Sequence, residues 1–145
     1  MSTLLLLPIT VLLLTVSPAN TAKPTSVTIG ALFPFYPHPS RPSENGMRNF
    51  DAFRMAIQRI NADHSVLPTT QLHYAVRDSR SAPNVAFTAT QDLVANSNVD
   101  VILVGQEDVF AAYDAAPDVV LVGHTSTSPT LSDKTIYPNF VRTGI

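Results

Sequence analysis

Two short apolar segments, residues 100–104 (DVILV) and 118–123 (DVVLVG), constrain the fold of this chain most strongly. Apolar runs of this length lack the polar alternation of a half-exposed strand and are typical of strands buried on both faces of a parallel sheet. Parallel strands need a long crossover between them, which is usually a helix. The rest of the chain therefore has to supply helices between strands.

The remaining sequence meets this requirement. Residues 25–33 (TSVTIGALF) and 71–77 (QLHYAVR) have the composition of strands, and residues 137–145 begin a further one. Between residues 46 and 62 apolar side chains recur at helical spacing, at Phe50, Phe53, Ile57 and Ile60. Residues 83–96 and 107–116 are predicted as two more helices, the first opened by Pro83 and the second stopped by Pro117. This alternation predicts an α/β fold with a doubly wound parallel sheet and right-handed crossovers.

The first 22 residues differ from the rest of the chain. Residues 4–16 are almost wholly apolar and are followed by small and polar residues, the pattern of a signal peptide cleaved after Ala19 or Ala22. The apolar run of 13 residues is shorter than the roughly 20 that a spanning helix needs. We expect a signal peptide over 1–22 and one exported domain over 23–145. An uncleaved anchor stays open, because no lysine or arginine precedes the apolar run.

Composition excludes several classes of function. The chain has no cysteine, so disulfides, cysteine nucleophiles and thiolate metal sites are excluded. Its net charge is -2 and its basic residues are scattered, so we expect no nucleic-acid partner. The four histidines lack zinc-ligand spacing, and Gly105 permits a tight turn but belongs to no dinucleotide motif. We expect no metal, no cofactor and no catalytic residue.

Ligands of doubly wound sheets bind beyond the carboxyl ends of the strands, near the point where strand order reverses. The loops expected there are residues 34–45, 105–108 and 124–129. The segment 124–133 holds six hydroxyl residues that can bind a polar ligand. Turn and helix capping, with Ser132 or Asp133 best placed, is the alternative interpretation. A serine hydrolase using His124 and Asp133 is disfavoured because no nucleophile-elbow motif is present.

Three charged residues lie in the same loops. Glu107 and Asp108 suit acid/base or metal chemistry, or else complement the dipole of a helix in whose first turn they stand. Arg41 can meet an anionic ligand group, or can be a solvated loop arginine. The sequence leaves these alternatives open.

Two longer stretches carry a family resemblance: residues 46–61 (GMRNFDAFRMAIQRIN) and, most specifically, residues 126–143 (STSPTLSDKTIYPNFVRT). With them, residues 27–145 resemble receptor ligand-binding regions of the type I periplasmic-binding fold, as found in class C G-protein-coupled receptors, natriuretic-peptide-type guanylate cyclases and glutamate receptors.

The resemblance implies a two-lobed clamshell that closes on a small molecule and does not catalyse a reaction. An amino-acid-like compound is one candidate for this ligand. This chain would be the N-terminal part of the first lobe. The second lobe and a membrane module would belong to a longer receptor. The resemblance also allows a homodimer that pairs through the first lobe. It would be extracellular or secreted, and membrane-associated within such a receptor. The implied ligand-binding residues are Thr125, Ser126, Thr127, Gly105, Gln106 and Arg41.

The chain departs from the family pattern in one loop. The family commonly has a glycine and then serines after its third strand, which take a ligand carboxylate, whereas this chain has Gly105-Gln-Glu-Asp108. Two acids would repel a carboxylate at close range, which disfavours an α-amino acid ligand. A solute-binding protein of a transporter and a small flavodoxin-like enzyme using Glu107 and Asp108 are the alternative functions.

Overall fold

The computed structural model describes residues 24–143. The signal peptide expected over residues 1–22 lies outside this range. Within the described range, no helix has both the length and the apolar character to cross a membrane.

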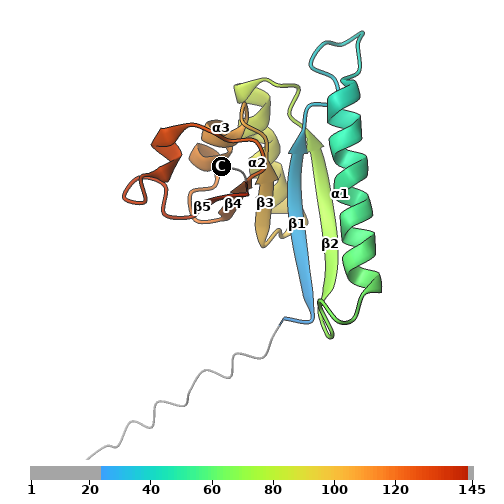
Figure 1. Ribbon diagram of the computed structural model, residues 1–145. Coiled ribbons are helices and arrows are strands. Elements are labelled where there is room, and N and C mark those ends of the chain that lie inside the picture. The colour runs from blue at the N-terminus through green and yellow to red at the C-terminus, as the bar shows by residue number, and fades with distance from the viewer. Residues whose placement is uncertain (1–23, 144–145) are drawn as a thin grey trace, which may run out of the picture.

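A single five-stranded sheet organises the described chain, and all of its strands are parallel (Figure 1). In chain order the elements are β1 (Ser26–Phe33), α1 (Glu44–Ala62), β2 (Gln71–Asp78), α2 (Pro83–Ser97), β3 (Val101–Val104), α3 (Val109–Ala115), β4 (Val120–Gly123), the 3-10 helix η1 (Pro129–Ser132) and β5 (Phe140–Arg142). The strands lie in the order β2-β1-β3-β4-β5, which confirms the predicted doubly wound α/β fold.

Strand order reverses between β1 and β3. After β1 the chain moves outward to β2, and then returns across β1 to form β3 on its other side. Loops that leave the carboxyl ends of β1 and β3 therefore diverge and leave a crevice between them.

The helices cover both faces of the sheet. Phe33 packs against Phe50 and Phe53 of α1, with ring centroids 6.0 and 5.8 Å apart. Its neighbour Leu32 belongs instead to the core formed with α2 and α3. Successive strand residues point to opposite faces, so α1 lies on one face of the sheet and α2 and α3 lie on the other, as Figure 1 shows.

The main core lies between the sheet and the α2–α3 face. Its fully buried or nearly buried members are Leu32, Ala86, Leu93, Ile102, Val104, Val109, Ala112, Tyr113, Leu121, Leu131 and Phe140. Both segments that were predicted as buried strands contribute to it, through Ile102 and Val104 of β3 and Leu121 of β4. Burial on that face accounts for these three residues, whereas the alternate residues Val101, Leu103 and Val122 are half-buried and Val120 is exposed.

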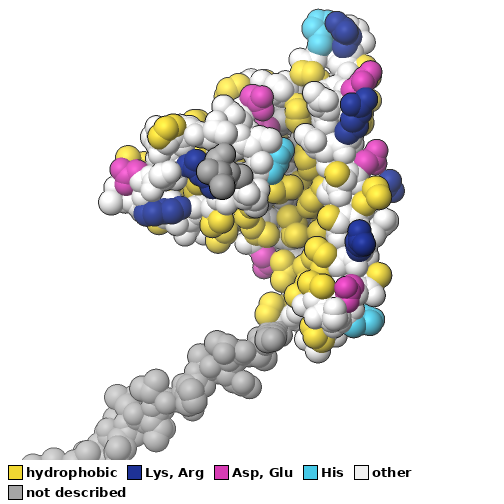
Figure 2. Space-filling model, in the orientation of Figure 1, with side chains coloured by type: hydrophobic (Ala, Val, Ile, Leu, Met, Phe, Trp, Pro, Cys, Tyr) yellow, Lys and Arg dark blue, Asp and Glu magenta, His cyan; other side chains and the backbone are white. Residues whose placement is uncertain are grey.

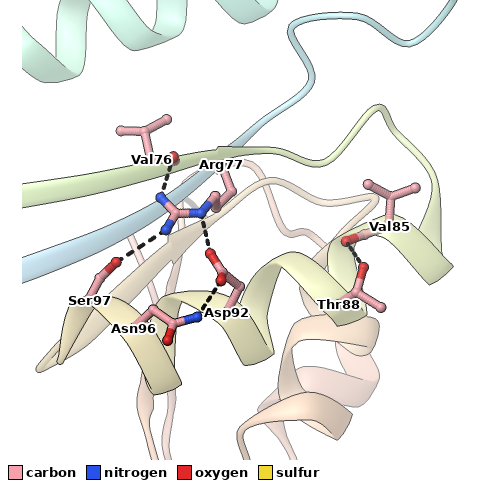
Figure 3. A network of polar contacts seen from close by, with 7 residues as sticks. All are labelled: Val76, Arg77, Val85, Thr88, Asp92, Asn96 and Ser97. Atoms are coloured by element: carbon pink, nitrogen blue, oxygen red, sulfur yellow. Dashed lines mark hydrogen bonds and ion pairs between the residues drawn. The ribbon is translucent and has the colours of Figure 1, made fainter.

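A polar network attaches β2 to α2 (Figure 3). Arg77 on β2 donates from Nε to Asp92 Oδ2 on α2 at 2.5 Å and from a terminal nitrogen to Ser97 Oγ at 3.3 Å. Asn96 donates to the other oxygen of Asp92 at 2.6 Å. These hydrogen bonds, first that of Asn96 and then that of Arg77, hold the pKa of Asp92 below its usual value.

Two predicted helix starts are wrong by two residues. Helix α1 begins at Glu44 rather than 46, because Ser43 is its N-cap and accepts a 3.0 Å hydrogen bond from the Gly46 amide. Helix α3 begins at Val109 rather than 107, because residues 105–108 form a turn in which the Asp108 amide donates to the Gly105 carbonyl at 3.3 Å. The 3-10 helix over Pro129–Ser132 had no sequence prediction.

Candidate ligand-binding site

A cleft of about 340 Å³ opens at the carboxyl edge of the sheet, where strand order reverses. Its lining comes from the ends of β1, β3 and β4, from the first turns of α1 and from the loop after β2. The lining residues are Leu32, Phe33, Pro34, Ser43, Asn45, Gly46, Asn49, Ser81, Gly105, Gln106, Glu107, His124 and Thr125. Its position agrees with the site expected for a doubly wound sheet.

A larger depression, of about 760 Å³, lies along the outer side of α1. It is lined by Ala52, Met55, Ala56, Gln58 and Arg59, all from that one helix. Residues of a single helix cannot surround a ligand with convergent polar groups, so this depression is the weaker candidate despite its size.

The wall formed by α1 depends on Gly46. A methyl group at this position would lie 2.2 Å from the carbonyl oxygen of Pro34, closer than any real contact. The first turn of α1 therefore sits directly on the end of β1. This close approach brings the side chains of Asn45 and Asn49 to the cleft.

The floor of the cleft is formed at Gly105. A methyl group there would lie 3.6 Å from Glu107 Oε2, 3.8 Å from His124 Nε2 and 4.0 Å from Thr125 Oγ1. A carboxylate, an imidazole and a hydroxyl thus converge over a residue without a side chain. No described glycine has a positive φ, so Gly105 provides space in the cleft and is not needed for a strained turn.

The loops after β3 and β4 are joined at the same place. The Gln106 amide donates to Thr125 Oγ1 at 3.1 Å, and Thr127 Oγ1 donates to Gln106 Oε1 at 3.5 Å. Three of the implied ligand-binding residues, Gly105, Gln106 and Thr125, line the cleft together, and Thr127 adjoins them.

Besides Thr127, which only adjoins the cleft, two of the implied ligand-binding residues, Ser126 and Arg41, are not among the residues that line it. Ser126 is 4% exposed, its hydroxyl has no hydrogen-bond partner in the described structure, and a methyl group on Gly123 would lie 2.6 Å from that hydroxyl. Ser126 therefore points into the interior beside β4. Arg41 is exposed, and its amide donates to the His38 carbonyl at 3.0 Å in a tight turn of the proline-rich loop.

Glu107 is the only aspartate, glutamate, lysine or arginine in the lining. His124 is the one other titratable side chain there. Burial lowers the pKa of His124, an effect that the nearby Glu107 carboxylate opposes only in part. The imidazole is therefore neutral at pH 7 and acts as a hydrogen-bonding group.

Asp108 does not share the surface of its neighbour. It is 1% exposed, and its Oδ1 has no hydrogen-bond partner among residues 24–143. Burial raises the pKa of Asp108; the nearby Ser79 hydroxyl lowers it, and Glu107 and Asp78 raise it further. The interpretation that both acids stand in the first turn of a helix is wrong, because Glu107 precedes α3 and Asp108 is an N-cap without a side-chain hydrogen bond.

The alternative interpretation of turn capping is correct for Asp133. Its Oδ1 accepts from the Thr135 amide at 2.9 Å and from the Thr135 hydroxyl at 2.6 Å, which lowers the pKa of Asp133. Ser132 instead accepts a hydrogen bond from Arg142 at 3.0 Å. The later half of the hydroxyl-rich segment is thus structural, and only its first residues reach the cleft.

Sequence reasoning missed Ser43, Asn45, Asn49 and Ser81 as lining residues. Ser43 before Glu44 is a recognisable helix-start signal. The two asparagines stand one turn apart on α1, but nothing in their spacing shows which side of the helix meets the strand ends.

Within residues 24–143 no three histidine or acidic side chains are close enough to hold a metal ion together.

Comparison with known proteins identifies the family. The family described as "Receptor family ligand binding region" matches residues 48–145. Over 122 residues the chain is 30% identical to the gamma-aminobutyric acid type B receptor subunit 1 of Mus musculus and, equally, of Rattus norvegicus. The alignment covers 81% of this chain and 12% of each relative, so the chain spans about an eighth of their length. The family match covers more than half of the chain, which therefore belongs to the receptor family ligand-binding region.

Proposed function

We propose that this chain supplies the first-lobe part of an extracellular small-molecule binding site in a membrane receptor, and that it binds its ligand without transforming it. The observation that carries the proposal is the convergence of Glu107, His124 and Thr125 over the bare backbone of Gly105. Ligand sites typically combine a concave surface with a few convergent polar groups, and this cleft has both.

The relatives support the receptor interpretation. The chain aligns with 12% of the length of a receptor subunit and so corresponds to one portion of a protein of that kind. In a complete receptor we expect a second lobe to close over the cleft, a membrane module to follow, and the first lobe to be available for pairing with another copy. A solute-binding protein of a transporter would use the same cleft.

The cleft does not bring together the two acids on which the enzyme interpretation rests. Glu107 lines it, but Asp108 does not, so the two adjacent acids cannot both face one substrate. An enzyme using this pair is therefore the weaker alternative.

The proposal is tested by titrating the 145-residue chain with three probes, gamma-aminobutyric acid, n-butylammonium and butyrate, and following its amide NMR signals. At least one probe should bind in the cleft with an affinity in the millimolar range, as expected for a half-enclosed site and a small ligand. Gly105→Ala is the matched variant, because its methyl group fits the fold but occupies the floor of the cleft.

Gly105→Ala should weaken the bound probe by about tenfold, a loss of about 1.4 kcal/mol, while the melting temperature stays unchanged. Absence of binding by all three probes, or equal affinity of the folded variant and the wild type, would contradict the proposal.

A further inference from the structure

The lining of the cleft contains an acidic side chain and no lysine or arginine to balance it. This side chain is Glu107, which is exposed. Of the arginines on neighbouring elements, Arg80 pairs with Asp78 at 3.7 Å and Arg48 pairs with Glu44 at 3.3 Å. The charged side chain that a ligand meets in the lining is therefore an acid, and water screens its charge only partly in a concave site.

The groups over Gly105 are mainly hydrogen-bond acceptors. Glu107 provides two carboxylate oxygens, and the neutral imidazole of His124 has one unprotonated nitrogen. An ammonium group has three N–H donors and no acceptor, so it matches such a set. A carboxylate has acceptors only, and would face Glu107 as a like charge.

The backbone of this turn is also poorly arranged for an anion. The Gln106 amide already donates to Thr125 Oγ1 at 3.1 Å, and the Asp108 amide donates to the Gly105 carbonyl at 3.3 Å. Amides at such a position can hold an anion only when they are free. Two of the amides in this turn are committed within the protein.

We propose that the first-lobe side of this cleft binds the cationic end of its ligand, a primary ammonium or similar N–H-bearing cation, and does not bind a carboxylate. Glu107 pairs with the cation, and His124 and Thr125 complete its hydrogen bonds. The inference rests on the proposed function, because it assigns a chemical class to the ligand of that same cleft. In a zwitterionic ligand, the anionic end would then be left for groups elsewhere in the receptor.

The three probes separate the two ends of a zwitterion. n-Butylammonium has only the cation, butyrate has only the anion, and gamma-aminobutyric acid has both on a chain of similar length. At constant ionic strength and pH 7, n-butylammonium should shift the amide signals of Gly105, Gln106 and Thr125 in the wild type, and butyrate should leave them unchanged.

Glu107→Gln removes the charge from an exposed side chain and keeps its size. It should weaken n-butylammonium by at least about tenfold. Asp118→Asn is the control, because it removes one exposed negative charge from the turn before β4, at the opposite edge of the sheet. It should leave the affinity unchanged.

Three outcomes would overturn the inference. Binding of butyrate without n-butylammonium would show an anion site and leave the proposed function standing. Equal loss of n-butylammonium in Glu107→Gln and Asp118→Asn would show attraction by net charge alone. If none of the three probes binds, the inference and the proposed function both fail.

Discussion

The Gln106 amide donates a 3.1 Å hydrogen bond to Thr125 Oγ1, and this contact joins the loops that leave the neighbouring strands β3 and β4. It sets the separation of the two loops at the cleft and commits an amide that would otherwise be free. Both residues line the cleft, so the contact belongs to the site itself.

Replacing Thr125 by valine should break this contact and keep the shape of the side chain. We expect a loss of about 1 kcal/mol in the free energy of unfolding, measured by denaturant titration, and faster hydrogen exchange at the Gln106 amide. Thr127→Val, which removes the longer 3.5 Å contact to the Gln106 side chain, is the control and should change neither quantity. An unchanged exchange rate in Thr125→Val would show that the contact is not formed in solution.

The two glycines of the cleft should respond differently to alanine. Gly46→Ala places a methyl group against the Pro34 carbonyl and should destabilise the fold by about 1–3 kcal/mol, although alanine is favoured over glycine within a helix by about 1 kcal/mol. Gly105→Ala should stay within about 0.5 kcal/mol of the wild type. Thermal or denaturant unfolding measures both, and equal stability of the two variants would contradict the close contact of α1 with the end of β1.

The imidazole of His124 reports the charge of Glu107. Its pKa lies below the usual value because burial outweighs the nearby carboxylate. Glu107→Gln removes the one influence that raises this pKa, so the pKa should fall further, as measured by NMR titration of the ring signals. A rise, or no change, would mean that Glu107 does not lie beside His124.

His124 also makes stability depend on pH. Its folded pKa is lower than its unfolded pKa, so the unfolded state binds a proton first as the pH falls. The stability contributed by neutral His124 is present above the unfolded value of about 6.5 and is lost as the pH falls through the folded pKa. Replacement by glutamine should remove this part of the pH profile.

Asp108 should act in the opposite direction. Its folded pKa is raised by burial, so the folded state holds a proton that the unfolded state has released. Its contribution is fully present below the unfolded pKa and is lost as the pH rises through the folded pKa. Asp108→Asn should therefore raise the melting temperature at pH 7, and the difference from the wild type should shrink towards pH 4. A variant less stable than the wild type at pH 7 would contradict this expectation.

The sheet was predictable because its signal is local. Val101–Val104 and Val120–Gly123 are apolar throughout, and that pattern required a buried parallel sheet with helical crossovers. The helix starts were less predictable, since the turn after Gly105 and the cap at Ser43 depend on contacts between elements.

The site was predictable in part for a related reason. Because the carboxyl ends of the strands could be predicted, Gly105, Gln106 and Thr125 were expected at one edge of the sheet, where the cleft lies. Composition does not show in which direction each side chain points after a strand. The adjacent residues Thr125 and Ser126 illustrate this, because Thr125 is exposed and lines the cleft whereas Ser126 is buried. Arg41 sits too far along the proline-rich loop for its position to follow from the sheet.

The most direct test of the account is a map of the amide signals that move when gamma-aminobutyric acid or n-butylammonium is added to the chain. We predict that the shifts concentrate at Phe33, Gly105, Gln106, His124 and Thr125, around the strand ends that form the cleft. Shifts confined to the outer side of α1, around Met55 and Arg59, or no shifts at saturating probe, would contradict it.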